Sequence, residues 1–265
     1  MLALLPLWRR TALLTANVSG IEFKSNGDGT CTFVGRGTCT DAEIIFPTKS
    51  PAGDTLTKLM GGRFFGDEVL TAVYIPETVI DIAVDTFAVC STIACINVSE
   101  DNTVYSSVGG VLYNKDITTL ILYPEAKTAE DFEIPASVTT IGIGAFVGAE
   151  NLKSISVPES VTRIYERAFL ICISLESVVI PDGVKTIYKS SFQNCPALAS
   201  VTIPASVEKI DESAFAECKA LSSIVFKGTK SQWESVKTKG NWRALVPAKG
   251  VTCSDGTEEF SFVYS

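Results

Sequence analysis

The chain has 265 residues, of which 46% are apolar and 20% are charged, a balance that indicates a folded core rather than a disordered chain. Its 22 Lys and Arg residues against 30 Asp and Glu give a net charge of −8, which argues against nucleic acid as a partner because phosphate binding requires a basic face. The sequence contains no His, which excludes the Ser-His-Asp and Cys-His catalytic arrangements.

Residues 1–16, MLALLPLWRRTALLTA, form an uncertain leader. They place an apolar stretch before Arg9 and Arg10 and a second, short apolar stretch after them. A secretory signal has its positive charges first and its longer apolar run second, so the order here is reversed. A degraded or truncated signal, a misplaced start and a short amphipathic leader all remain open. No run of 18 or more apolar residues occurs, and we expect no transmembrane helix.

Residues 17–43 are predicted to form an N-terminal cap hairpin. Cys31 and Cys39 flank the turn Gly35-Arg36-Gly37, where a hairpin would bring the two thiols opposite each other. In an oxidising compartment, a disulfide between them would stabilise this cap.

A 23-residue block then dominates the chain. Four consecutive copies begin at Ile134, Val157, Ile180 and Ile203. Each copy opens with an apolar residue and Pro, and it repeats the same apolar positions, which in the third copy are Val184, Ile187, Phe192, Leu198 and Val201. One block is too small to bury its own apolar row, so the pattern predicts a solenoid in which copies stack on one another.

The same register continues upstream with more substitutions. The 23-residue spacing recurs between Ile75 and Val98, whereas 36 residues separate Val98 from Ile134. We therefore expect an insertion at about 99–133, with short strands at 110–113 and 120–123 joined by a turn at 114–116. The predicted solenoid runs over residues 44–226 in about seven coils.

The repeated blocks, such as IPASVTTIGIGAF and IPASVEKIDESAF, resemble the BspA-like leucine-rich repeat family. That resemblance implies an α/β-type repeat solenoid, mostly β: a right-handed leucine-rich repeat solenoid of about seven coils, with an N-terminal β cap and a C-terminal cap that contains a short helix. It also implies a cell-surface or secreted protein with roles in adhesion, matrix-protein binding and co-aggregation.

Residues 227–265 are predicted to form the C-terminal cap. The segment SQWESVK fits a short helix with Ser231 as its N-cap. Trp233 and Trp242 are expected to pack in the core of this cap rather than to contact a ligand.

Four of the eight cysteines lie three residues after a repeat Phe, and these are Cys90, Cys172, Cys195 and Cys218. A fixed slot of this kind predicts a column of small buried thiols rather than a metal site, which would need clustered ligands. We expect no metal, no cofactor and no catalytic residue.

The strand of each coil offers the first candidate binding surface. Because alternate strand residues point in opposite directions, the residues between the inward Val and Ile form outward columns. The candidate residues on this strand face are Tyr74, Asn97, Ser154, Ser156, Ser177, Val179, Ser200, Thr202, Ser223 and Val225. Such a neutral, hydroxyl-rich ladder could hold an extended peptide or glycan, although Ser and Thr are also common at exposed strand positions without any function.

A second candidate surface is aromatic. Tyr165 and Tyr188 occupy the same slot in adjacent coils on the opposite wall, where they form either a contact site or a structural pair. Tyr105 and Tyr113 lie in the insertion and are expected to project from the spiral.

These features favour a non-enzymatic binding module for a protein or glycan ligand, and we expect a monomer. The alternatives are a structural or intracellular protein-protein interaction scaffold, or an accessory domain of a larger secreted protein.

Overall fold

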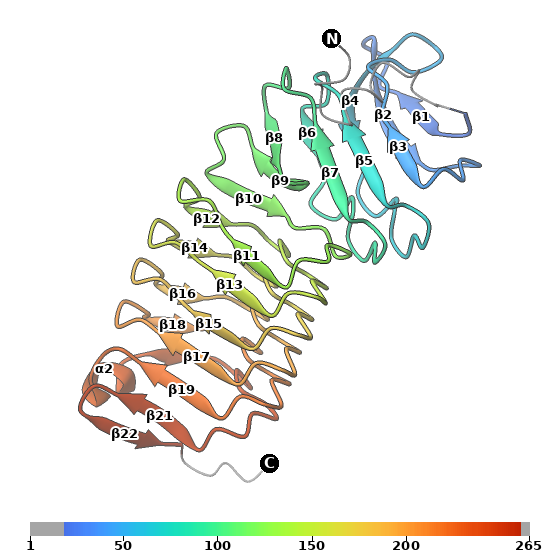
Figure 1. Ribbon diagram of the computed structural model, residues 1–265. Coiled ribbons are helices and arrows are strands. Elements are labelled where there is room, and N and C mark those ends of the chain that lie inside the picture. The colour runs from blue at the N-terminus through green and yellow to red at the C-terminus, as the bar shows by residue number, and fades with distance from the viewer. Residues whose placement is uncertain (1–18, 261–265) are drawn as a thin grey trace, which may run out of the picture. The chain divides into compact units, whose positions relative to one another are not determined.

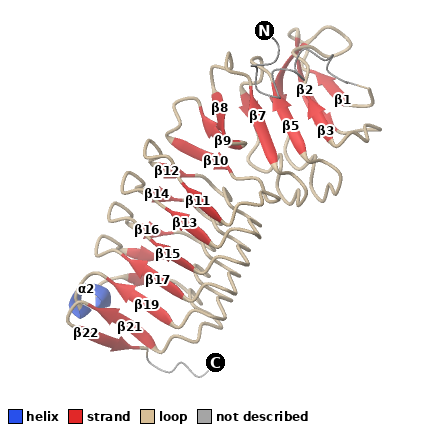
Figure 2. Cartoon of the chain, in the orientation of Figure 1, coloured by secondary structure: helices blue, strands red, loops and turns tan. Residues whose placement is uncertain are grey.

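The computed structural model describes residues 19–260, so the leader at 1–16 lies outside the described residues. The chain divides into two compact units. Unit 1 contains the residues up to 116 together with 124–126, and unit 2 contains 117–123 together with the residues from 127 onward. Both units consist of short strands joined by turns, and within residues 19–260 the one helix is α2 of unit 2, visible in Figures 1 and 2.

Unit 1 consists of two ladders of parallel β-strands. One antiparallel hairpin lies near the start of the unit and a second lies near residue 110. The first sheet has the order β1 (Glu22–Ser25), β2 (Thr30–Gly35), β4 (Thr55–Leu59) and β6 (Asp81–Ile82). The second sheet has the order β3 (Glu43–Ile45), β5 (Ala72–Ile75) and β7 (Cys95–Val98). The hairpins are β1 with β2, and β8 (Tyr105–Val108) with β9 (Val111–Asn114).

Unit 2 repeats the two-ladder arrangement with greater regularity. The strand face is formed by β11 (Asp131–Glu133), β13 (Ser154–Ser156), β15 (Ser177–Val179), β17 (Ser200–Ile203), β19 (Ser223–Phe226), β21 (Gly250–Cys253) and β22 (Gly256–Glu259). The opposite wall is formed by β10 (Thr119–Leu122), β12 (Thr140–Ile141), β14 (Arg163–Ile164), β16 (Thr186–Ile187), β18 (Lys209–Ile210) and β20 (Lys237–Thr238). Strands pair with residues 23 positions along, as in Val178 with Val201 and Ile187 with Ile210.

Stacked phenylalanines form the centre of both units. In unit 2 the rings of Phe146, Phe169, Phe192 and Phe215 follow one another with centroid separations of 4.8, 5.1 and 5.2 Å and interplanar angles of 13°, 4° and 3°. All four side chains are fully buried. The predicted register is confirmed, because a one-residue slip would have moved these rings out of the core.

The thiol column predicted beside this Phe stack is also confirmed. Cys90, Cys172, Cys195 and Cys218 are fully buried. In three of them the thiol donates a hydrogen bond to the carbonyl oxygen of the repeat Phe of the preceding coil, over 3.1, 3.1 and 3.0 Å. The thiols therefore link successive coils through the turn carbonyls, and the Phe146 carbonyl also accepts from the Ala149 N–H.

The turn around each repeat Phe requires left-handed backbone. The residue two positions after the Phe has a positive φ in successive coils, as at Gly66, Val89, Gly148, Ile171, Asn194 and Glu217. Gly and Asn tolerate this conformation, whereas a β-branched residue is strained in it. Ile171 adopts this conformation with a φ of 62°, and its N–H donates to the Gln193 carbonyl of the next coil over 3.0 Å.

The C-terminal cap contains α2 (Lys230–Glu234). Its N-cap is Thr229, not the predicted Ser231, and Thr229 forms a capping box with Gln232. Thr229 prevails because its hydroxyl accepts from the Gln232 N–H while the Gln232 side chain accepts from the Thr229 N–H. Trp233 and Trp242 are buried as expected, and their rings meet edge to face at 6.2 Å.

The coil count differs from the prediction of about seven, since the described residues make about ten turns of a mostly-β solenoid. The caps account for the difference because they add strands to the ladders. In the N-terminal cap, β2 pairs in parallel with β4, and Phe33 stacks on Phe64 at 5.1 Å. In the C-terminal cap, β20 continues the opposite wall after β18, and β21 continues the strand face after β19.

Both strands predicted inside the insertion are present. The strands expected at 110–113 and 120–123 are β9 and β10. Within unit 1, β9 pairs antiparallel with β8, which the sequence did not indicate. Within unit 2, β10 pairs in parallel with β12, because Thr119 and Leu120 continue the register of Thr140 and Ile141.

Candidate functional site

The outward-pointing residues of the strand face form columns at the predicted positions. In unit 1 the register places Ile45, Tyr74 and Asn97 side by side. In unit 2 it places Ser177, Ser200 and Ser223 in one column and Val179, Thr202 and Val225 in the next. Ser154 and Ser156 lie on β13, and both are exposed. Among these side chains Val179 is the most exposed apolar one, at 53%.

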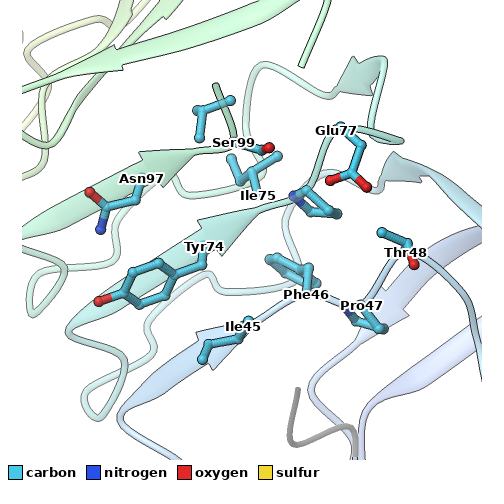
Figure 3. A pocket seen from close by; sticks show the side chains of 11 residues that line it. Ile45, Phe46, Pro47, Thr48, Tyr74, Ile75, Glu77, Asn97 and Ser99 are labelled. Carbon is cyan, nitrogen blue, oxygen red and sulfur yellow. The ribbon is translucent and has the colours of Figure 1, made fainter. Parts of the chain in front are cut away.

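A groove of about 340 Å³ crosses the strand face of unit 1 at the ends of β3, β5 and β7. The outward side chains of Ile45, Tyr74 and Asn97 line one side, and Pro47, Pro76 and Ser99 line the other. Its floor is the buried row Phe46, Ile75 and Val98. Figure 3 shows Tyr74 and Asn97 extending from neighbouring strands toward the same end, with Thr48 and Glu77 at the other end.

The sequence accounts for each part of this groove. Strand alternation sends Phe46, Ile75 and Val98 inward and the flanking residues outward. The Pro that follows β3 and β5 has no N–H to donate, so the ladder stops there and the chain turns away. With strands about 4.8 Å apart, three strands provide a groove about 10 Å long, the span of about three residues of an extended peptide.

Asn102, whose role the sequence did not reveal, fixes the rim of the groove. Its side chain is fully buried and donates to the carbonyls of Pro76 and Val79, each over 2.8 Å. It also accepts from the N–H groups of Val104 and Tyr105 over 2.9 and 2.8 Å. This one amide therefore joins the turn after β5 to the start of the hairpin β8–β9, and only its position directly after the NVSED turn could have suggested such a role.

The groove combines an apolar floor with a few polar groups. The amide nitrogen of Asn97 lies 3.3 Å from the Cys95 sulfur, which orients the side chain along the face. Glu77 is exposed at the rim, and Tyr74 is half-buried. A mostly apolar cleft with sparse polar groups at its edge is typical of a ligand-binding site.

The strand face of unit 2 differs in charge from the sequence prediction. Its first strand, β11, pairs in register with β13, so Asp131 lies beside Ser154 and Glu133 beside Ser156. Both acidic side chains are exposed. The neutral ladder therefore begins with two carboxylates, which the position of EDFEIP directly before the first regular block could have indicated.

On the opposite wall, Tyr165 and Tyr188 are neighbours as predicted. Their ring centroids are 5.5 Å apart with an interplanar angle of 36°, and both side chains are half-buried.

The two tyrosines of the insertion do not project, and this prediction is wrong. Tyr113 is only 1% exposed, and burial raises its pKa to about 12. Tyr105 is half-buried, and its hydroxyl accepts a hydrogen bond from the Ile82 N–H over 3.0 Å, which closes the edge of β6. Both side chains complete the packing of unit 1 because the hairpin β8–β9 folds back on the solenoid.

The hairpin predicted between Cys31 and Cys39 does not form. The antiparallel partner of β2 is β1, so Cys31 lies opposite Ser25, and the connecting turn is at 26–29. Both thiols are free and buried, and the Cys31 sulfur lies 3.5 Å from the Asp54 carbonyl oxygen. The turn at 35–37 instead places Arg36 against Asp67, with 2.5 Å between Nη1 and Oδ2.

Residues 19–260 contain few side chains that are suited to nucleophilic attack or to metal binding. Burial, with a smaller contribution from the Asp67 carboxylate, raises the pKa of Cys90 to about 11, so this thiol stays protonated at neutral pH and is a poor nucleophile. No group of three or more His, Cys, Asp or Glu side chains in this range could hold a metal ion. None of its helices is long and apolar enough to span a membrane.

Parallel ladders at a 23-residue period, a Phe stack and an open strand face define a leucine-rich repeat solenoid. The chain belongs to the family described as the BspA type leucine rich repeat region, which matches it in six copies over residues 51–131 and 121–236.

Three solved structures share this fold. A leucine rich cell surface protein from Faecalibacterium prausnitzii is 20% identical, with a TM-score of 0.51 over 84% of this chain and 97% of that one. A leucine-rich repeat protein from Eubacterium ventriosum is 24% identical, with a TM-score of 0.55 over 82% and 70%. Another from Bacteroides ovatus is 20% identical, with a TM-score of 0.53 over 89% and 70%. Among curated proteins, none matches the chain.

Proposed function

We propose that this chain is a non-enzymatic adhesion module of a surface-exposed or secreted protein, and that it binds an extended protein segment in the groove across β3, β5 and β7. The groove itself carries the proposal, since three successive coils align Ile45, Tyr74 and Asn97 over a continuous apolar floor. Membership of the BspA type family and the cell-surface description of the Faecalibacterium protein support the location.

The shape and chemistry of the groove favour a peptide over a compact small molecule. Its length matches about three extended residues. Its apolar floor would take alternate side chains, while the Asn97 amide and the Glu77 carboxylate at the rim would bond to the main chain of the ligand. Pro47 and Pro76 form a rigid side of the groove, so little entropy is lost when a ligand is bound.

The test begins with a screen of the purified chain against immobilised extracellular-matrix proteins and a glycan array. For the tightest protein ligand, Tyr74→Ser combined with Asn97→Ala should raise Kd by about tenfold or more, because the double change removes one wall of the groove. The matched variant, Ser177→Ala with Ser200→Ala on the same face of unit 2, should leave Kd unchanged.

Two results would refute this proposal. If the groove variant bound as tightly as the parent while the Ser177 and Ser200 variant lost binding, the site would lie on the strand face of unit 2. If only glycans bound, the ligand class would be wrong. Circular dichroism of both variants must show an unchanged melting temperature before the comparison is made.

A further inference from the structure

The opposite wall of unit 2 has a charge opposite to that of the whole chain. Its segments 163–167, 185–189, 208–212 and 237–239 contain seven basic residues, Arg163, Arg167, Lys185, Lys189, Lys209, Lys237 and Lys239. They contain four acidic residues, Glu166, Glu208, Asp211 and Glu212. Across the full sequence acidic residues prevail, 30 to 22. The wall is therefore a local basic surface on an acidic protein.

Ion pairs on this wall neutralise its acidic side chains more completely than its basic ones. Lys185 pairs with Glu208 over 3.2 Å and Lys189 with Glu212 over 3.0 Å. Two lysines share the carboxylate of Asp211, Lys209 at 2.9 Å and Lys239 at 3.6 Å. Within residues 19–260, Arg163 and Lys237 form no ion pair, and both side chains are exposed.

The strand register aligns basic residues of successive coils. Lys209 on β18 pairs directly with Lys237 on β20. The Lys209 ammonium already pairs with Asp211, so the Lys237 ammonium is the one of this pair that is available to an external anion. Arg163 lies in the same outward column on β14, two coils away from Lys209, and Figure 1 shows β14, β16 and β18 in succession along this side of unit 2.

An aromatic pair and a polar groove complete the surface. Tyr165 and Tyr188 form the neighbouring outward column, with ring centroids 5.5 Å apart. A groove of about 550 Å³ lies between β18, β20 and α2, and its lining includes Glu208, Lys209, Lys237, Ser231 and Gln232. Half-buried tyrosine rings offer a flat apolar face with a polar edge, while hydroxyl and amide groups offer both donors and acceptors.

We propose that this wall of unit 2, from Arg163 to Lys237, binds a linear anionic polysaccharide that carries sulfate or carboxylate groups. The in-line cations recognise its anions, the tyrosine pair contacts its ring faces, and the groove beside α2 bonds to its hydroxyls. A nucleic acid fits less well, because Glu208, Asp211 and Glu212 are interspersed along the wall and repel a densely charged phosphate backbone. An acidic peptide could bond to the groove through its main-chain amides, but it would bring no sugar ring to the tyrosine pair.

This inference concerns a surface separate from the groove of unit 1, and neither depends on the other. The probes are fluorescein-labelled dextran sulfate, polygalacturonate and unsulfated dextran, measured by fluorescence anisotropy at about 0.15 M salt, where surface charges are screened beyond about 8 Å. Dextran sulfate and polygalacturonate should bind, unsulfated dextran should not, and added salt should weaken the binding.

Two variants locate the site. Lys209→Gln with Lys237→Gln should raise Kd for both anionic probes by about tenfold. Tyr165→Leu with Tyr188→Leu should raise it by about fivefold while leaving its salt dependence unchanged, because this pair supplies no charge. The matched control, Lys219→Gln with Lys249→Gln, makes the same change in net charge at exposed positions outside the wall and should alter Kd by less than about twofold.

The proposal is overturned if the control variant loses as much affinity as the wall variant, because binding would then follow net charge alone. It is also overturned if unsulfated dextran binds equally well. Binding of a DNA duplex or poly-glutamate at least as tight as that of dextran sulfate would likewise reject a polysaccharide as the ligand.

Discussion

Replacing Phe192 with Ala tests the packing that holds the coils together. Phe192 is fully buried, and its ring stacks on Phe169 at 5.1 Å and on Phe215 at 5.2 Å. The nearly parallel planes, at 4° and 3°, mean that one side chain supplies both interfaces of its coil. In a solenoid, stability is approximately a sum of repeat and nearest-neighbour terms, so the substitution weakens two of these at once.

The expected cost is about 3 to 5 kcal/mol, the usual range for Phe to Ala in a core that cannot collapse around the gap. Collapse is opposed here because the backbone bonds Phe169 N–H to the Ser191 carbonyl and Phe192 N–H to the Ala214 carbonyl keep the coils apart. Urea unfolding followed by circular dichroism measures the change. Phe65→Ala is the control, since Phe65 is 67% exposed, and it should cost less than about 0.5 kcal/mol. Equal midpoints for the Phe192 variant and the parent would refute the assigned stack.

Two other predictions concern charge and backbone strain. Burial alone would raise the pKa of Asp67, but hydrogen bonds from Arg36 and from the N–H groups after it outweigh this effect, so its pKa lies below the usual value. Its stabilisation is therefore present above about pH 4 and is lost as the pH falls through the lowered pKa. Asp67→Ala should cost about 3 kcal/mol at neutral pH, because Arg36 is left buried without its partner, and the difference from the parent should shrink in acid. A constant difference down to about pH 2 in urea titrations would contradict the pairing. Separately, Ile171→Asn should stabilise the chain by about 1 kcal/mol, because Asn tolerates the φ of 62°. Ile173→Asn, at a similar 39% exposure but without a positive φ, should give no gain in melting temperature.

The sequence predicted the regular coils because their register is redundant. Phe146, Phe169, Phe192 and Phe215 recur at one spacing with the same neighbours, so each copy supports the assignment of the next. The thiol column followed from the same register. The helix cap was displaced by two residues, since both Thr229 and Ser231 can cap a helix and only the reciprocal bond with Gln232 selects between them.

Features outside the period could not be placed in this way. Tyr113 and Tyr105 lie in the insertion, where no register distinguishes an exposed aromatic from a buried one. The groove of unit 1 depends on Ile45, Tyr74 and Asn97 being larger than the Ser, Thr and Val of later coils, so that they form a wall at the turn after each strand. The columns were predictable from alternation, whereas the depth beside them arises from side-chain volume.

The surface contacts between coils show how such a chain can change its length. Lys58 meets Asp81, Lys185 meets Glu208 and Lys189 meets Glu212, and each pair joins residues 23 positions apart. The thiol-to-carbonyl bonds and the strand pairs also join each coil to its neighbour with the same atoms. An in-frame duplication or deletion of one whole block therefore keeps the strand register and the buried apolar positions of the junctions. Tandem gene rearrangement can thus lengthen or shorten the molecule by about 4.8 Å per coil without a new fold.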